Sequence, residues 1–364
     1  MPQALYIHIP FCHRVCPYCA FFKHTPGATD MRAFVAGIVK EAELRLPEGW
    51  TPRTIYFGGG TPSMLSPKHL GDLVEGLQRH IDTTHVEEWS FEANPATFTA
   101  AKVEHWRRLG INRVSLGAQS FEPELLHLLG REHTPAQVAE SVHLLRAVGM
   151  PQVNLDLMFC LPGQTPPQWR HTLEAALELQ PDHLSTYSLT LEEGTPFATA
   201  YPLPDEETEV ELYTLAHDLL TTAGYRHYEV SNYARCDSAR SLHNLTYWRG
   251  ESYYGLGPGA YGTVGNLRYM NTEDTAAYSA ALAAGALPPG TREQLEPEAR
   301  RTEQLGLHLR TDEGIPLSLL RASDAATLHL LVQEGLARCV AGERLALTPR
   351  GMLLADEVAV QLMG

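Results

Sequence analysis

Short runs of β-branched and aromatic residues alternate with amphipathic stretches along the first two thirds of the chain. The predicted strands cover residues 5–10, 53–57, 88–92, 112–116, 153–159 and 183–189. Helical periodicity covers residues 31–44, 67–81, 100–109, 135–148 and 166–179 between them. Strand–helix–strand units joined by right-handed crossovers build a parallel sheet, so the chain is predicted to be an α/β protein. The pattern fits a partial barrel or an open doubly wound sheet equally well, and in both the reactive groups lie at the carboxyl ends of the strands.

The alternation ends near residue 192, and the last third is predicted to contain two further parts. After a helix at 206–223, residues 231–268 are rich in aromatics, Asn and Gly without a sustained period, which is typical of a functional loop. Residues 276–297, rich in Ala, Gly and Pro, are predicted to be a linker. Helical stretches from Arg300 and Ser323, two strands at 336–340 and 344–347 and a last helix from Pro349 predict a small winged-helix-like domain. The predicted domains are 1–230, 231–297 and 298–364.

The charge balance argues against nucleic acid as a partner. The chain has 28 Lys and Arg against 43 Asp and Glu, a net charge of −15, and no block of like charges forms a basic arm. No basic segment followed by an apolar stretch opens the chain, and no apolar run approaches the roughly 18 residues of a membrane span. We therefore expect a cytoplasmic protein.

Three of the six cysteines, Cys12, Cys16 and Cys19, lie close together after the first predicted strand. Three thiolates leave one iron of a 4Fe-4S cluster open, and the amine and carboxylate of S-adenosylmethionine (SAM) can bind there. The reduced cluster can then pass an electron to the sulfonium, which gives methionine and a 5′-deoxyadenosyl radical. One alternative is that the three thiols are inert, and another is that they bind zinc together with His13 or His24. With zinc, the chain could be a zinc-dependent winged-helix regulator.

Polar and glycine-rich segments follow the later strands. The glycines at 58–60, followed by Thr61, allow a backbone to approach a ligand closely, although such a segment can also be a simple tight turn. The side chains able to meet the amine, ribose hydroxyls and carboxylate of SAM are those of Glu92, Gln119, Arg131 and Asp156. Taken singly, each of these is a common residue at a surface or core edge.

These segments carry a resemblance to a known family. The stretches 6–12, 58–62, 115–120, 129–133 and 154–164 resemble the oxygen-independent coproporphyrinogen III oxidase family and the related HemW-type heme chaperones over nearly the whole chain. The resemblance implies a partial (β/α)6 radical SAM barrel with a small C-terminal winged-helix-like domain. It also implies SAM contacts, with Tyr18 beside the cluster, from Tyr6, Gly59, Gly60, Thr61, Glu92, Gln119, Arg131 and Asp156.

Two departures from the oxidase pattern favour the chaperone. The motif of the oxidase has a fourth cysteine at the position that Phe21 occupies in this chain. The oxidase also carries an extended segment before its first strand, which in this chain starts at residue 5. The alternative remains an oxygen-independent coproporphyrinogen III oxidase, which decarboxylates propionates by radical chemistry.

A segment further along the chain also resembles the chaperones. It comprises His243, Asn244, Tyr247 and Trp248, and matches a stretch tied to heme binding in that family. Imidazole can ligate iron and aromatic rings can cover a porphyrin, although a histidine among aromatics is often structural. The resemblance therefore implies a monomeric or homodimeric heme chaperone with a 4Fe-4S cluster and SAM. Its partners would be heme and the membrane-bound hemoproteins of the respiratory chain that receive it, with peripheral contact to the membrane.

Overall fold

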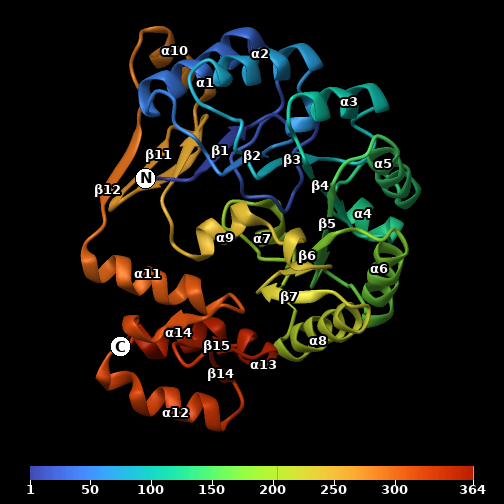
Figure 1. Ribbon diagram of the computed structural model, residues 1–364. Helices are drawn as coiled ribbons and strands as arrows, with labels where there is room; N and C mark the ends of the chain where they lie inside the picture. The colour runs from blue at the N-terminus through green and yellow to red at the C-terminus, as the bar shows by residue number, and fades with distance from the viewer. Residues whose placement is uncertain (203, 364) are drawn as a thin grey trace.

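The computed structural model describes residues 1–202 and 204–363, and in these residues the larger sheet has twelve strands. Its centre is a run of parallel strands in chain order (Figure 1). These are β1 (Ala4–Ile9), β2 (Thr54–Gly59), β3 (Glu88–Ala93), β4 (Arg113–Gln119), β5 (Gln152–Phe159) and β6 (His183–Ser188). A doubly wound sheet reverses its strand order at a switch point, whereas this order never reverses. The consecutive order therefore decides for the partial barrel.

Helices cover the outer face of this barrel (Figure 1). They are α1 (Met31–Arg45), α2 (Pro67–Gln78), α3 (Ala100–Arg108), α5 (Pro135–Ala147), α6 (Pro166–Glu178) and α8 (Glu206–Thr222). The short helices α4 (Pro123–Leu128) and α7 (Pro196–Ala200) lie instead near the cysteine loop, in one hydrophobic cluster with Tyr18. Local sequence sets several helix starts, because Thr134 and Thr165 form capping boxes with glutamines three residues later. Inside the helical layer, Trp169 is fully buried and stacks on Phe159 with ring centroids 5.5 Å apart. The indole thereby fixes α6 against β5.

The segments predicted to be a loop and a linker are instead part of the sheet, so both predictions are wrong. Strand β9 (Tyr253–Leu256) pairs in parallel with β1, and β10 (Tyr261–Val264), β11 (Leu267–Asn271) and β12 (Gly290–Gln294) continue the sheet antiparallel. At the other edge lie β8 (Asn232–Ala234) and β7 (Arg226–Glu229). Strands of three to five residues carry too few positions to show a period of two. Alanine-rich α10 (Thr275–Ala283) occupies the predicted linker, because alanine favours helix.

A buried carboxylate ties these added strands to the barrel. Glu41 of α1 is fully buried and accepts hydrogen bonds from the backbone N–H of Gly257 at 2.9 Å and from the hydroxyl of Tyr278 at 2.7 Å. Arg45 donates to the same carboxylate at 2.9 Å. The three donors satisfy a charge that burial alone would make costly.

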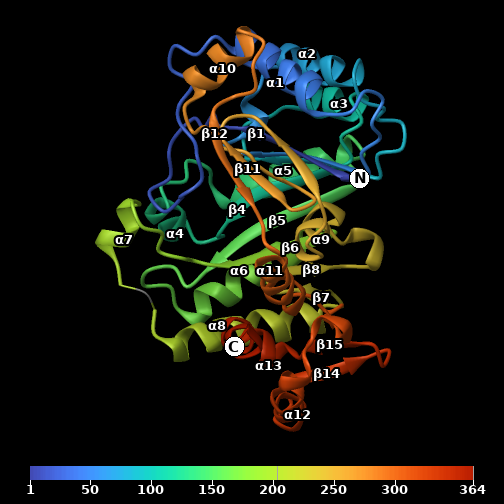
Figure 2. The same cartoon turned by 90° about the vertical axis from the view of Figure 1, so that its left-hand side faces the viewer.

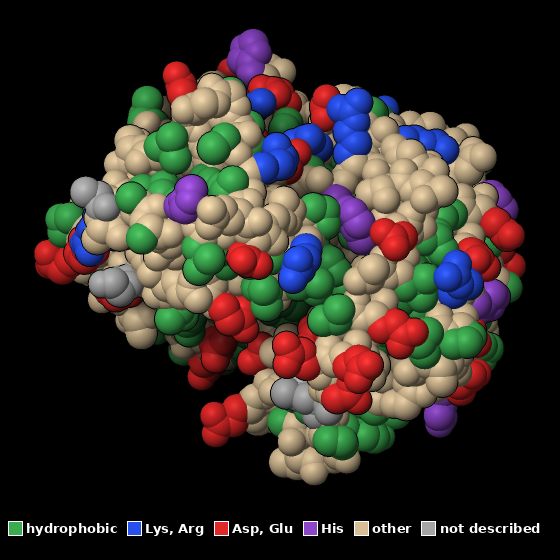
Figure 3. Space-filling model, turned by 90° about the horizontal axis from the view of Figure 1, so that it is seen from below, with side chains coloured by type: hydrophobic (Ala, Val, Ile, Leu, Met, Phe, Trp, Pro, Cys, Tyr) green, Lys and Arg blue, Asp and Glu red, His purple; other side chains and the backbone are tan. Residues whose placement is uncertain are grey.

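The C-terminal part has a core of its own beside the barrel (Figure 2). Its elements are α11 (Pro297–Leu309), β13 (Ile315–Pro316), α12 (Ala325–Gln333), β14 (Ala337–Val340), β15 (Arg344–Leu347), α13 (Pro349–Met352) and α14 (Ala355–Met363). The two predicted strands are therefore present as β14 and β15, whereas the domain boundaries remain predictions. Seen from below, Lys and Arg lie mainly along one edge of the molecule, with Asp and Glu mainly along the opposite edge (Figure 3). Within the described residues, no helix combines the length and the apolarity that crossing a membrane demands.

Candidate functional site

The three clustered cysteines lie on the loop between β1 and α1 and are all partly buried. The hydroxyl of Thr61 donates to Cys12 Sγ at 3.5 Å, and Arg131 Nη1 lies 3.8 Å from Cys16 Sγ. Burial raises the pKa of the Cys12 thiol, and the nearby Cys19 and Cys16 raise it further. The cysteines are thus close to one another, but Cys12 and Cys16 contact different side chains.

Three cysteines on one loop are the protein donor set of a 4Fe-4S cluster that keeps one iron open. A cubane takes its thiolates on different iron atoms, so its cysteine ligands stay apart. The donor set therefore suits a 4Fe-4S cluster with one iron free for a further ligand.

Beside the cysteine loop, at the carboxyl ends of the strands, lies a cavity of about 450 Å³. Most of the residues predicted to contact SAM line it, namely Tyr18, Gly60, Thr61, Glu92, Gln119, Arg131 and Asp156, together with Cys19. They come from the cysteine loop and from the ends of four different strands or the loops after them. The structure thus brings together side chains that are up to about 140 positions apart in the sequence.

Tyr6 and Gly59 lie behind this cavity and do not line it. His8 Nε2 donates to the carbonyl of Phe22 at 2.8 Å, so His8 Nδ1 is left to accept the Tyr6 hydroxyl at 2.9 Å. The backbone N–H of Gly59 donates to Glu92 Oε2 at 3.1 Å. Gly59 therefore supports Glu92, which lines the cavity, whereas Tyr6 holds His8, which does not.

Neighbouring protein atoms explain the glycines at 59 and 60. A Cβ on Gly59 would lie 2.5 Å from the His8 ring, and Gly59 also has a φ of +108°. A Cβ on Gly60 would lie 2.7 Å from the backbone of Pro10 and Phe11, at the start of the cysteine loop. The segment after β2 therefore packs directly against the chain that carries Cys12.

Two partly buried carboxylates, those of Glu92 and Asp156, line the cavity. Glu92 accepts the Tyr56 hydroxyl at 2.8 Å, yet burial and the nearby Asp156 raise the pKa of Glu92 to about 7. Burial also raises the pKa of Asp156, which accepts hydrogen bonds from Ser115 at 2.9 Å and Asn154 at 2.8 Å. Desolvation is the dominant cause for both groups. The site is thus prepared for a ligand that carries positive charge or hydroxyl donors.

Arg131 supplies the cationic group of the cavity. Its Nη2 donates to the carbonyl of Gly117 and to Asn94 Oδ1, both at 2.6 Å. Strand β4 is irregular beyond Leu116, and Gln119 adopts a φ of +66°, which turns its side chain into the cavity. A guanidinium fixed in this way can pair with a carboxylate.

Sequence reasoning missed several lining residues, including Tyr56, Asn94, Ser115 and Tyr187. The signal was the alternation within each strand, because positions two apart share a face. Tyr56 pairs in register with Tyr6 and with Ser90, while Ser115 pairs with Glu92. Polar residues at alternate positions of adjacent parallel strands therefore mark the inner face.

The segment predicted to bind heme forms α9 (Leu242–Trp248), which closes the opposite end of the barrel from the cavity mouth. His243 is fully buried, and burial lowers its pKa to about 3. Its Nδ1 lies 2.8 Å from Thr54 Oγ1, its Nε2 lies 2.8 Å from the Tyr247 hydroxyl, and its ring stacks on Tyr56. Both ring nitrogens are therefore engaged, and this conformation does not present His243 to iron.

The other residues of the segment are likewise held by protein contacts. Tyr247 packs edge-on against Tyr253 with ring centroids 4.6 Å apart, and the Trp248 indole hydrogen bonds to the buried Glu229. The backbone N–H of Asn244 donates to the hydroxyl of the helix-capping Ser241 at 3.3 Å. The expectation of an open porphyrin surface on α9 is therefore not met in this conformation.

Comparison with known proteins places this geometry in a family. The model of the radical SAM superfamily matches residues 6–176. The heme chaperone HemW of Mycobacterium tuberculosis is 36% identical, with 100% of this chain and 95% of that protein covered. That of Bacillus subtilis is 33% identical over 100% of this chain and 99% of its own. The chain belongs to the HemW family of the radical SAM superfamily.

A solved structure shows the same fold as this HemW family member. Coproporphyrinogen III oxidase of Escherichia coli superposes with a TM-score of 0.83 at 24% identity, over 99% of this chain and 90% of that chain. Membership of the superfamily implies a 4Fe-4S cluster and SAM, which the cysteine loop and the adjacent cavity fit.

Proposed function

We propose that this protein is a heme chaperone that binds heme in the cytoplasm and delivers it to membrane-bound hemoproteins of the respiratory chain. Its similarity to curated HemW chaperones along the full length of both chains carries this proposal. Phe21 supports it, because this phenyl ring stands where the oxidase motif has its fourth cysteine and is 71% exposed at the edge of the cavity.

In this proposal Cys12, Cys16 and Cys19 hold the cluster and the adjacent cavity holds SAM. When bound, the reduced cluster supplies an electron that can cleave SAM. Glu92 and Asp156 would accept hydrogen bonds from the amine and the ribose hydroxyls of bound SAM, while Arg131 would balance its carboxylate. The largely buried walls strengthen each of these interactions by excluding water.

Heme binding to α9 requires this helix to move. His243 must exchange its contacts with Thr54 and Tyr247 for iron, and Trp248 must turn its ring toward the porphyrin. The low pKa of His243 means that its ring is already neutral, so ligation costs no deprotonation.

Heme titration of the reconstituted protein tests the proposal. Heme should bind with a shifted Soret band, and His243→Ala should weaken binding about tenfold or more because an iron–imidazole bond is lost. His171→Ala is the matched control, since His171 is exposed and pairs with Glu122 on the outside of the barrel. Circular dichroism and iron content should confirm that both variants keep the fold and the cluster.

A second assay separates the chaperone from the oxidase. Protein with its cluster, SAM and a reductant should form no protoporphyrinogen from coproporphyrinogen III under anaerobic conditions. Repeated turnovers to that product would overturn the proposal, as would unchanged heme affinity in His243→Ala.

A further inference from the structure

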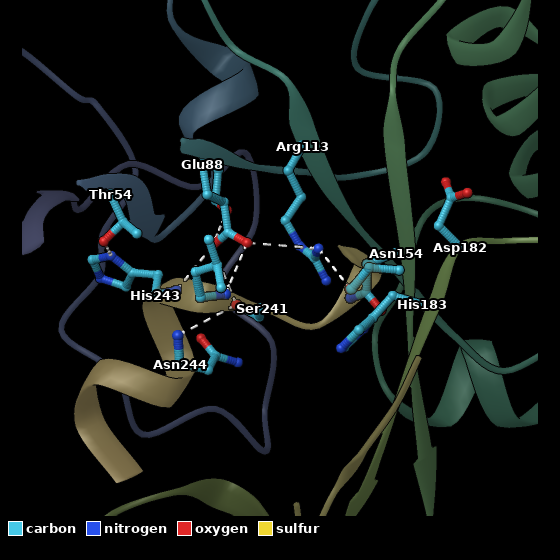
Figure 4. A network of polar contacts seen from close by, with 12 residues as sticks. Thr54, Glu88, Arg113, Asn154, Asp182, His183, Ser241, His243 and Asn244 are labelled. Carbon is cyan, nitrogen blue, oxygen red and sulfur yellow. Dashed lines mark hydrogen bonds and ion pairs between the residues drawn. The ribbon is translucent and has the colours of Figure 1, made fainter. Parts of the chain in front are cut away.

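A chain of hydrogen bonds crosses the barrel from the SAM cavity to the first turn of α9. Asn154 Nδ2 lies 2.8 Å from Asp156 Oδ1, and Asn154 Oδ1 lies 2.6 Å from His183 Nδ1. His183 Nε2 lies 2.8 Å from the Tyr228 hydroxyl, which lies 3.0 Å from the backbone N–H of Ser241. Asn154, His183, Tyr228 and Ser241 are all buried, and Figure 4 shows Asn154 and His183 close together inside the barrel.

Chemistry fixes the direction of every bond in this chain. The amide of Asn154 must turn its NH2 toward Asp156, because its carbonyl oxygen would face a carboxylate. Asn154 Oδ1 then accepts from His183 Nδ1–H, so His183 Nε2 is an acceptor for the Tyr228 hydroxyl. The Tyr228 oxygen in turn accepts the N–H of Ser241. All donors therefore point from α9 toward Asp156, an arrangement in which each bond polarises the next.

A second contact reaches α9 from the other cavity carboxylate. Tyr56 donates its hydroxyl to Glu92, and its ring stacks on His243 with centroids 5.0 Å apart. Helix α9 is thus linked to Asp156 through three intervening side chains and to Glu92 through Tyr56 alone.

The same turn of α9 has an anchor that does not involve the cavity. Glu88 accepts the backbone N–H groups of Leu242 at 2.9 Å and His243 at 3.0 Å. Figure 4 shows Glu88 pointing toward the start of this helix, next to Ser241 and His243. Arg113 pairs with Glu88 at 3.7 Å and donates to the carbonyl of Ala239 at 2.9 Å. This anchor keeps α9 in place when the cavity contacts change, so the cavity can adjust the mobility of the helix without unfolding it.

We propose that His183 and Tyr228 are positioning residues that couple occupancy of the SAM cavity to the mobility of α9. A ligand that fixes Asp156 restrains Asn154 and, through His183 and Tyr228, the amino end of α9. Because coupling is reciprocal, displacement of α9 weakens SAM binding by the same factor. This inference rests on the proposed function for the identity of the cavity ligand. It implies that bound SAM opposes the movement of α9 that exposes His243.

Hydrogen exchange of the reconstituted protein with and without saturating SAM tests this coupling. In the native sequence, SAM should slow exchange of the amides in α9 threefold or more. Tyr228→Phe keeps the ring but removes the hydroxyl, so this SAM-dependent slowing should disappear while iron content and circular dichroism stay unchanged. A purely structural role would alter exchange equally with and without SAM.

Tyr225→Phe is the matched control, because the Tyr225 hydroxyl donates to the carbonyl of Pro181 at 2.5 Å and lies outside the chain of bonds. This variant should keep the full effect of SAM. Full SAM-dependent slowing in Tyr228→Phe would overturn the inference, and so would its absence from the native protein. If the native protein shows the slowing but binds no heme, the coupling is supported and only the heme proposal fails.

Discussion

Glu92 illustrates how single residues set the chemistry of this site. The side chain accepts hydrogen bonds from Tyr56 and the Gly59 backbone, but these do not offset its burial beside Asp156. Near pH 7 the carboxyl is therefore only partly ionised in the protein without ligand. A positively charged ligand placed against it would favour the ionised form.

This raised pKa predicts a pH-dependent cost to stability. The pKa of Glu92 rises from 4.5 to about 7 on folding, so the folded state binds the proton more tightly and loses stability as pH rises through that window. The cost is absent below about pH 4.5 and complete above about pH 7, where it amounts to about 3 kcal/mol.

Glu92→Gln removes this dependence. Urea unfolding without SAM should therefore show the variant gaining stability relative to the native protein between pH 5 and pH 8. A difference between the two proteins that is the same at both pH values would contradict the pKa shift.

At this scale the sequence predicted the charged groups better than their aromatic surroundings. Glu92 and Asp156 could be placed because each lies in a strand whose hydrophobic pattern is clear, whereas Arg131 follows α4 and was indicated by the family resemblance. The orientation of His243 could not be predicted, because it depends on Glu88 accepting the first amides of α9 from a strand about 155 positions away.

Among the elements, the turn after β2 does more than its glycines suggested. Gly60 contacts the backbone at the start of the cysteine loop, and the next residue, Thr61, donates to Cys12. The turn after β2 therefore holds the cysteine loop in position through contacts with its first residues.

Gly60→Ala should displace the cysteine loop, because the new Cβ would lie 2.7 Å from backbone atoms that cannot rotate away. We expect reconstituted iron and sulfide to fall well below the level of the native protein and toward that of Cys12→Ala. Gly71→Ala in α2 serves as the control, since its Cβ would make only ordinary contacts at 3.6 Å. Full cluster content in Gly60→Ala would show that the loop is not held by this turn.

Longer elements were the predictable ones. The parallel strands and their helices follow clear hydrophobic periods, whereas β9 to β12 are short and rely on pairing with β1 and with one another. Strand β12 is exposed at every position, so nothing in its composition marks it as a strand.

Over the whole molecule, ion pairs join the barrel to the C-terminal part. Arg240 binds Asp312 through two contacts at 3.1 and 2.9 Å, and Arg249, next to the end of α9, pairs with Glu313 at 3.0 Å. Each part has its own buried cluster, although Leu353 packs against that of the barrel, and the backbone N–H of Asp312 donates to the carbonyl of Tyr228 at 2.9 Å. The paired charges therefore reinforce these contacts at the junction.

Replacing both carboxylates should let the C-terminal part unfold first. In the double variant Asp312→Asn, Glu313→Gln, we expect a loss of about 1–2 kcal/mol at the junction. All five tryptophans precede residue 249, so their fluorescence reports the barrel, while circular dichroism reports both parts. The circular dichroism transition should come to precede the fluorescence transition.

Asp72→Asn is the control, because it removes only a surface pair with Lys68. Coincident transitions in the double variant would show that the junction does not depend on these pairs.

The position of α9 also constrains the order in which ligands exchange. The helix contacts Thr54 and Glu88, which are the first residues of β2 and β3, and it therefore closes the amino end of the barrel. A ligand of Asp156 therefore enters from the other end of the barrel, where Cys19 and Phe21 line the cavity. Because ligands enter and leave the cavity through the same opening, the ligand that binds last must leave first. A molecule bound against Phe21 would therefore have to leave before SAM could leave.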